Sequence, residues 1–120
     1  YVFGGTTSSQ TQINDIQQCG LVNSHNPIIY ACDLISPVLK EARYYSRAIT
    51  LGKTIVIMCG QTLSGTIDVT EIFDASELFI YQGPKLYGGP RRQCCLVNYH
   101  NKIYVYGGET EINDGIVKIK

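Results

Sequence analysis

Short apolar runs that end in glycine divide the chain at three places. Residues 1–5 read YVFGG, residues 55–60 read IVIMCG, and residues 103–108 read IYVYGG. Short runs rich in Tyr, Ile and Val that are bounded by glycine and asparagine turns are typical of β-strands. The run at 55–59 is apolar at every position, which predicts a strand buried on both of its faces.

These runs recur at a nearly constant interval. The last glycines of the three runs are 55 and then 48 residues apart: Gly5, Gly60 and Gly108. An arginine stands 17 residues before each of the last two glycines, at Arg43 and Arg91. A polar loop and an isoleucine-aspartate sequence follow each run, with the aspartates Asp15, Asp68 and Asp114. A period of about 50 residues indicates a repeat architecture.

Each repeat unit is predicted to hold four short antiparallel strands, so the expected fold class is all-β. In the middle unit the strands span about 44–51, 53–59, 67–73 and 77–82. The chain then divides into the end of one unit with its outer strands (1–42), one complete unit (43–90) and the start of the next (91–120). The stretch GPKLYGGP at 83–90 is the expected connection between units.

The pattern resembles the kelch-repeat β-propellers. Gly4-Gly5 and Gly107-Gly108 resemble the double glycine of that family, and residues 68–74, DVTEIFD, resemble its third strand with Phe73 at the aromatic position. Arg43 and Arg91 match an arginine that often precedes the first strand. Three features depart from the family: Cys59 replaces a glycine, Cys19 stands at an expected aromatic position, and the chain has no Trp.

The resemblance implies that the chain forms part of a larger propeller of antiparallel four-stranded blades. Two and a half repeats do not close a ring, and each blade leaves an apolar face that only a neighbouring blade covers. The isolated chain is therefore expected to be loosely folded or prone to aggregation.

Charge and cysteine content narrow the classes of function. Ten basic and ten acidic residues among 120 leave no net charge and no visible basic patch for nucleic acid. The longest apolar runs are far too short to span a membrane. Five cysteines, an odd number at no metal-binding spacing, favour an intracellular setting, cytoplasmic or cytoskeletal. Cys59, Cys94 and Cys95 are accordingly expected to be reduced and largely buried.

The sequence contains no recognisable active site. Cys94 and Cys95 are expected to point to opposite faces of a strand, which favours packing over a joint redox or metal site. His25 and His100 fall in predicted turns, without further ligands at metal spacing. The repeated aspartates are expected to cap turns before the third strand. No catalytic residue, metal or cofactor is therefore expected.

Several residues are candidates for contact with a partner. Arg43 and Arg91 either bond to carbonyls or a carboxylate within a blade or face a partner. Lys85, Leu86 and Tyr87 lie at the tip of the connection 83–90, where Tyr87 either anchors a partner or folds back onto its own blade. The expected contact loops are 6–12, 61–66 and 109–111 at one end of the blades, and 36–42 and 83–90 at the other.

The expected function is a non-enzymatic protein-interaction scaffold or adaptor, or a subunit of a larger assembly, because loops on a rigid scaffold are where binding concentrates. The resemblance implies a protein partner or neighbouring blades, and the charge balance and short apolar runs lead us to expect neither nucleic-acid binding nor membrane insertion. The alternative is a fragment of a propeller enzyme, similar to galactose oxidase, whose active site lies mostly outside this chain.

Overall fold

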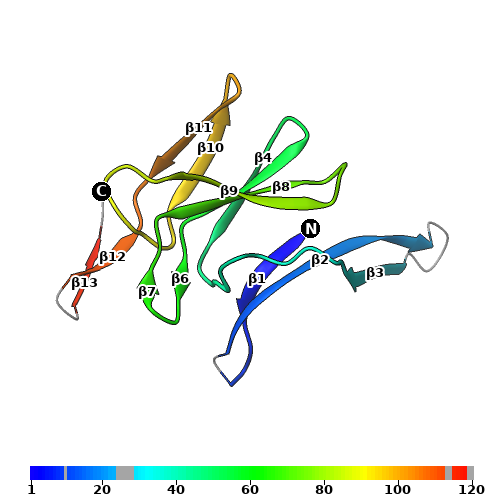
Figure 1. Ribbon diagram of the computed structural model, residues 1–120, viewed down its shortest axis with the longest axis horizontal. Coiled ribbons are helices and arrows are strands. Elements are labelled where there is room, and N and C mark those ends of the chain that lie inside the picture. The colour runs from blue at the N-terminus through cyan, green and yellow to red at the C-terminus, as the bar shows by residue number, and fades with distance from the viewer. Residues whose placement is uncertain (10, 24–28, 113–114, 119–120) are drawn as a thin grey trace.

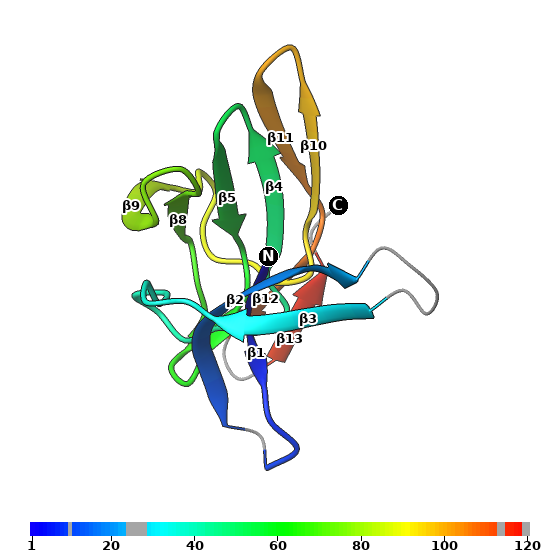
Figure 2. The ribbon, with the colours of Figure 1, turned by 90° about the vertical axis from the view of Figure 1, so that its right-hand side faces the viewer.

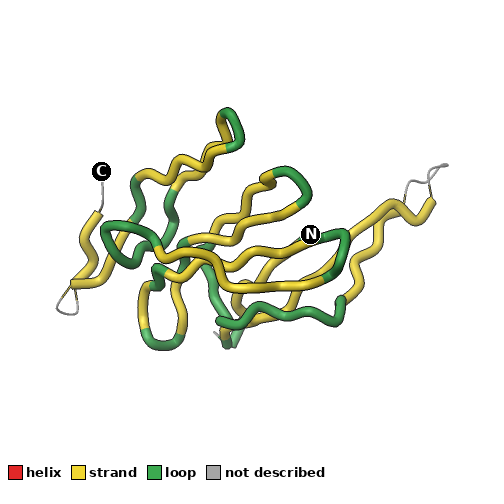
Figure 3. The backbone as a smooth tube through the Cα atoms, turned by 45° about the horizontal axis from the view of Figure 1, so that its top comes forward, coloured by secondary structure: helices red, strands yellow, loops and turns green. Residues whose placement is uncertain are grey.

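The computed structural model describes residues 1–9, 11–23, 29–112 and 115–118, and none of these residues is helical. All paired strands in the described residues are antiparallel, which confirms the predicted all-β class (Figure 3). The strands are β1 (Val2–Thr6), β2 (Gln12–Asn23), β3 (Ile29–Leu34), β4 (Arg47–Leu51), β5 (Thr54–Met58), β6 (Gln61–Thr62), β7 (Gly65–Thr66), β8 (Val69–Asp74), β9 (Phe79–Lys85), β10 (Cys95–Tyr99), β11 (Lys102–Tyr106), β12 (Glu109–Ile112) and β13 (Gly115–Lys118). No helix long and apolar enough to cross a bilayer occurs in this part of the chain.

The middle of the chain forms one four-stranded sheet in the order β4-β5-β8-β9 (Figure 1). Its strands agree closely with the four strands predicted for residues 44–82. The last strand, β9, continues to Lys85, so residues 83–85 belong to the sheet and not to the connection that the sequence predicted. Between β5 and β8 the chain also forms a short hairpin, β6–β7, where only a loop was expected.

Parts of two similar units flank this sheet. We call β1–β3 the first unit, β4–β9 the second and β10–β13 the third. The first unit is a three-stranded sheet, β1-β2-β3, and the third consists of the hairpins β10–β11 and β12–β13. Strands β4 and β10 contact each other, and the β4–β5 and β10–β11 pairs stand side by side in Figure 2.

The three glycine-marked positions share one backbone conformation. Their φ angles are 63° and 116° at Gly4 and Gly5, 62° and 117° at Cys59 and Gly60, and 70° and 104° at Gly107 and Gly108. Positive φ favours glycine because a Cβ atom crowds the backbone there. The repeat seen in the sequence is therefore a repeat of backbone geometry, and Cys59 adopts a glycine-like conformation.

Hydrogen bonds between units repeat as well. The Gly5 amide donates to the Arg43 carbonyl over 2.8 Å, and the Gly60 amide donates to the Arg91 carbonyl over 2.9 Å. Inside the second and third units, equivalent isolated antiparallel bridges pair Tyr44 with Gln61 and, 48 residues further on, Arg92 with Glu109. Neighbouring units are thus joined through equivalent backbone positions.

Two apolar clusters lie between the units. The first joins Ile16 and Leu39 to Ile57, Phe73 and Ile80 of the central sheet. The second is built on Val56, Met58, Cys59 and Cys94, with Leu96, Ile103 and Val105 of the third unit packed against it. Both faces of the central sheet are therefore covered by a neighbour, as the continuous apolar run at 55–59 predicted.

Arg43 has the structural role that was one of its two predicted alternatives. Its side chain is fully buried, donates from Nη1 to the carbonyl oxygens of Cys59 (3.1 Å) and Val69 (2.9 Å), and pairs through Nη2 with Glu71 (2.7 Å). Arg91, 48 residues later, donates to the Gly107 carbonyl at 3.4 Å. In the second and third units, the repeated arginine therefore holds the backbone at the first position of the glycine pair.

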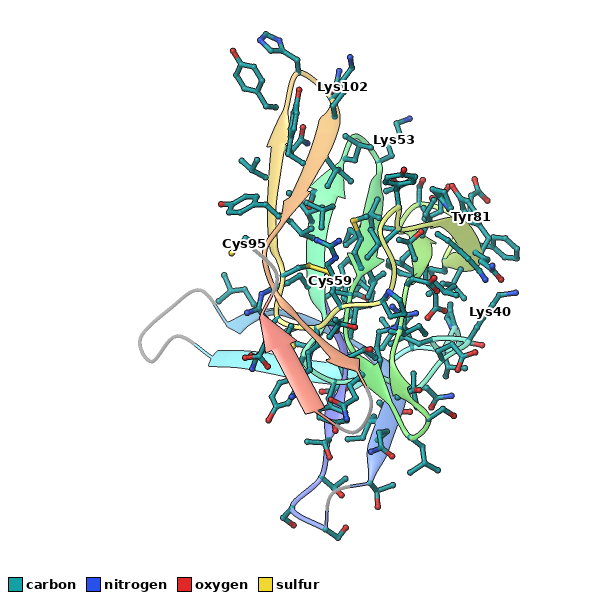
Figure 4. All side chains as sticks on the ribbon, turned by 90° about the vertical axis from the view of Figure 1, so that its left-hand side faces the viewer. Lys40, Lys53, Cys59, Tyr81, Cys95 and Lys102 are labelled. Carbon is teal, nitrogen blue, oxygen red and sulfur yellow. A yellow bond between two sulfur atoms is a disulfide. The ribbon has the colours of Figure 1, made fainter. Side chains whose placement is uncertain are left out.

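Four of the five cysteines form disulfide bonds, so the expectation of reduced thiols is wrong for Cys59 and Cys94. Cys59 is bonded to Cys94 and links the second unit to the third, and Cys19 is bonded to Cys32 across the β2–β3 pair. Cys95 is free but exposed, which also corrects its predicted burial (Figure 4). Adjacent residues do point to opposite sides here, since Cys94 is buried and Cys95 is not.

Replacing Cys59 and Cys94 together with serine should lower stability by about 2–4 kcal/mol, because the cross-link between two units is lost. Thermal unfolding of this double variant and of the unchanged chain, with and without a thiol reductant, measures the effect. The matched control is the Cys19→Ser/Cys32→Ser variant, which keeps the bond between units. Finding free thiols at Cys59 and Cys94 by non-reducing peptide mapping would contradict the assignment.

Replacing Arg43 with leucine should destabilise the fold by about 3–5 kcal/mol, because Glu71 is then left as an unpaired buried charge. Urea unfolding measures the change. Arg47→Leu is the control, since Arg47 is exposed and bonds only to the adjacent Ser46 carbonyl. Equal losses in the two variants would show that the buried pair is not important for stability.

Candidate binding site at the loop end

The connections that follow β5 and β9 lie at the same end of the central sheet. In the antiparallel order, Arg47 at the start of β4 lies opposite Met58 at the end of β5, and Val69 at the start of β8 lies opposite Lys85 at the end of β9. The segments after β5 and after β9 therefore leave from the same end, which we call the loop end. The prediction that residues 36–42 and 83–90 lie opposite residues 6–12, 61–66 and 109–111 is wrong.

Figure 1 shows this arrangement directly. The β1–β2 tip and the β6–β7 and β12–β13 hairpins lie in the lower half of the view, whereas the turns of β4–β5 and β10–β11 point upward. The first predicted loop of the third unit, 109–111, is part of strand β12. Each unit thus contributes a hairpin to the loop end.

One hollow at the loop end, which we call the larger hollow, is built by all three units. It encloses about 470 Å³ and is lined by Thr6 and Gln12 of the first unit, Tyr44 and Tyr45 preceding β4, and Arg92 preceding β10. A second hollow of about 250 Å³ shares Gln12 and is otherwise lined by Glu41, Ala42, Thr62, Leu63 and Ser64. The two hollows bring together the predicted contact loops 6–12, 36–42 and 61–66.

Arg92 is held firmly in the wall of the larger hollow. Its Nε lies 3.3 Å from a carboxylate oxygen of Glu109, and its Nη1 donates to the side-chain oxygen of Gln61. The guanidinium carbon lies 5.6 Å from the centre of the Tyr45 ring, a cation–π distance. The hollow therefore presents a fixed cation whose charge is partly balanced by one carboxylate.

The two tyrosines supply aromatic surface beside this cation. The ring centres of Tyr44 and Tyr45 are 4.7 Å apart, and Tyr45 is about half exposed. The Tyr45 carbonyl accepts a hydrogen bond from the Gln93 amide (3.0 Å), and both residues have positive φ, at 56° and 54°. Such a wall can stack against and hydrogen-bond to a ligand.

The predicted partner-binding residues separate into exposed and packed ones. Tyr87 is fully exposed, at 102% of its reference area, so the alternative in which it folds back onto its blade is wrong. Lys85 is exposed in β9, and Arg91 is half-buried. Leu86 packs against the second apolar cluster, and its amide donates to the Asp68 carbonyl (2.8 Å). Buried Arg43 and packed Leu86 are therefore no longer candidates for partner contact.

The repeated aspartates do not form the predicted caps in the residues that the structure describes. Asp15 lies within β2, neither Asp15 nor Asp68 hydrogen-bonds through its side chain to another described residue, and Asp114 lies outside the described ranges. Asp74 caps a turn instead: one carboxylate oxygen accepts from the Ser76 amide (2.9 Å), the Ser76 hydroxyl (2.8 Å) and the Glu77 amide (3.1 Å). The sequence Asp-Ala-Ser after a strand is the signal for this turn.

His100 is the histidine that the structure describes. His100 is exposed in the two-residue turn between β10 and β11, where His100 and Asn101 both have positive φ, while His25 lies outside the described residues. In the part of the chain that is described, no group of three His, Cys, Asp or Glu side chains is placed to hold a metal ion.

Sequence reasoning placed Thr6 and Gln12 in a contact loop but missed the other three residues that line the larger hollow, Tyr44, Tyr45 and Arg92. Tyr44 and Arg92 occupy equivalent positions in the repeat, because each directly follows one of the repeated arginines. An alignment of the two repeats was therefore the signal in the sequence that could have identified this pair. Comparison with known proteins adds no family, because no family model and no curated protein matches this chain.

Asp74 should titrate below the ordinary range for aspartate. The Ser76 hydroxyl, followed by the Glu77 amide, hydrogen-bonds to the carboxylate and lowers the pKa of Asp74. Because the folded-state pKa is depressed, this capping contributes to stability above the ordinary pKa and is lost as pH falls through the folded value. An NMR titration measures the shift, and Ser76→Ala should move the pKa back upward; no movement would contradict the assignment.

Proposed function

We propose that the chain is part of a kelch-type β-propeller that acts as a non-enzymatic protein-binding scaffold, with the loop end as its binding surface. The observation that carries this proposal is the larger hollow, to which three successive units contribute tyrosine, arginine and polar side chains. Tyr and Arg are among the residues that most often dominate the binding energy of protein interfaces. Loops presented by a rigid scaffold are also the usual place for binding.

The repeat geometry supports the propeller part of the proposal. A complete antiparallel four-stranded sheet packs face to face with a neighbour on each side, and equivalent backbone contacts recur from unit to unit. Stacked four-stranded sheets of this kind are the blades of propellers. The kelch resemblance of the glycine pairs and of Arg43 points to the same architecture.

We also infer an oxidising compartment in place of the intracellular one that the sequence favoured. Two disulfide bonds, one of them buried between units, support this setting. Structural disulfides persist mainly in secreted, periplasmic or lumenal proteins. The scaffold would then meet its partner outside the cytosol.

The binding proposal predicts which positions contact a partner. A photo-crosslinking amino acid at position 45 or position 87 should capture the same protein in the native setting, whereas one at position 81 should not. Tyr81 is the matched control, since it is an exposed tyrosine on strand β9 and does not belong to the loop end.

The captured protein then allows affinity to be measured. Tyr45→Ala and Tyr87→Ala should each weaken binding by about 1–2 kcal/mol or more, roughly five- to thirtyfold, with little change in melting temperature. Tyr81→Ala should leave affinity unchanged. Capture at position 81 alone, or a loss of stability without a loss of affinity in the loop-end variants, would overturn the proposal.

A further inference from the structure

The two disulfide bonds of the chain lie in opposite surroundings. Cys59 and Cys94 are both fully buried between the second and third units. Cys19 and Cys32 are both exposed, and they lie directly opposite each other on β2 and β3. A thiol reduces a disulfide by attacking one of its sulfur atoms, so the rate depends on access to that sulfur. The exposed disulfide is therefore the more reactive of the two.

The residues beside the exposed disulfide leave room for an attacking group. Gly20 and Ala31 form the pair next to the two cysteines, and a Cβ atom at position 20 would meet no other atom within 4 Å. A hollow of about 280 Å³ lies at this place. It is lined by Gln18, Gly20, Leu21, Ala31 and Asp33, which flank the cysteines on both strands. A second protein can therefore bring a thiol close to this disulfide.

The part of β2 and β3 beyond the disulfide has few other contacts. The two strands stay paired past the cysteines, at residues 20–23 and 29–31, which we call the ribbon end. Figure 1 shows β2 and β3 reaching away from the central sheet. Of the described residues in these two strands, only Ile16 belongs to an apolar cluster. Because a two-stranded ribbon is marginally stable by itself, the disulfide is the main link that keeps the ribbon end closed.

We propose that Cys19 and Cys32 form a redox site, which a protein with a reactive pair of cysteines reduces while the bond between Cys59 and Cys94 stays intact. Reduction opens the ribbon end and leaves the central sheet and its junction with the third unit in place. This site goes beyond the proposed binding function, because it uses no residue of the larger hollow.

The exchange needs no reactant other than this dithiol. One thiolate of the dithiol bonds to the Sγ atom of Cys19 or Cys32, the bond between the two Sγ atoms breaks, and the other cysteine leaves as a thiolate. The second thiol of the dithiol then attacks the mixed disulfide and releases the first cysteine. The dithiol ends as a disulfide, and the chain gains two electrons and two protons as two thiols.

Timed reduction of the folded, purified protein with dithiothreitol tests the site. The free Cys95 is first blocked with light iodoacetamide, and thiols that appear later are trapped with the heavy reagent and located by mass spectrometry. Cys19 and Cys32 should appear about tenfold faster than Cys59 and Cys94 or more, and the rates should converge in urea, where access is equal. Equal rates in the folded protein would overturn the proposal. So would an equally large difference in urea, or free thiols at Cys19 and Cys32 before reduction.

Hydrogen exchange measures the opening of the ribbon end independently. Protein reduced only at Cys19 and Cys32 should exchange the amides of residues 20–23 and 29–31 several-fold faster than the oxidised protein. The Cys19→Ser/Cys32→Ser variant should behave in the same way, and exchange in β4 and β5 should not change. Unchanged exchange at the ribbon end would overturn the proposal. So would a loss of protection that spreads to β4 and β5, because the disulfide would then support the whole fold.

Discussion

The buried pair of Arg43 and Glu71 fixes the point where the first unit meets the second. Arg43 reaches the carbonyls of Cys59 and Val69, so one side chain ties the end of β5 to the start of β8. Glu71 accepts from the backbone amides of Lys40 (2.5 Å) and Glu41 (3.4 Å), which anchors the segment that arrives from the first unit. Burying two charges is costly, and the cost is offset in part because Nη1 and Nη2 of Arg43 and both carboxylate oxygens of Glu71 have partners, whereas the buried Nε of Arg43 has none.

The same pair determines where the loop end can form. With residues 40–43 held against the central sheet, Leu39 lies in the first apolar cluster and Tyr44 pairs with Gln61 beside the larger hollow. Arg91 donates to the Gly107 carbonyl as Arg43 donates to the equivalent Cys59 carbonyl, and Arg92, the residue equivalent to Tyr44, also lines the larger hollow. The hollow is therefore a consequence of how successive units are joined, and it needs three of them.

The sequence predicted the strands of the second unit well, because alternation, apolar runs and glycine turns are local signals. Sequence-based prediction failed for features that depend on several strands or units at once. The end of the sheet at which each connection lies depends on the order of all four strands. Tyr45 and Arg92 line a common hollow only because the second and third units contact each other. Cys59 and Cys94 are 35 residues apart, and their pairing follows from packing between units that no spacing rule contains.

Cys59 shows why a departure from the glycine pattern can persist. A non-glycine residue at positive φ costs about 1–2 kcal/mol, and Gly4 and Gly107 avoid that cost at the equivalent positions. The disulfide to Cys94 contributes about 2–4 kcal/mol in return, but only where it stays oxidised. Under reducing conditions Cys59 would carry the backbone cost without the cross-link, so glycine would be the better residue. A cysteine at this position is therefore stabilising only where the disulfide stays oxidised.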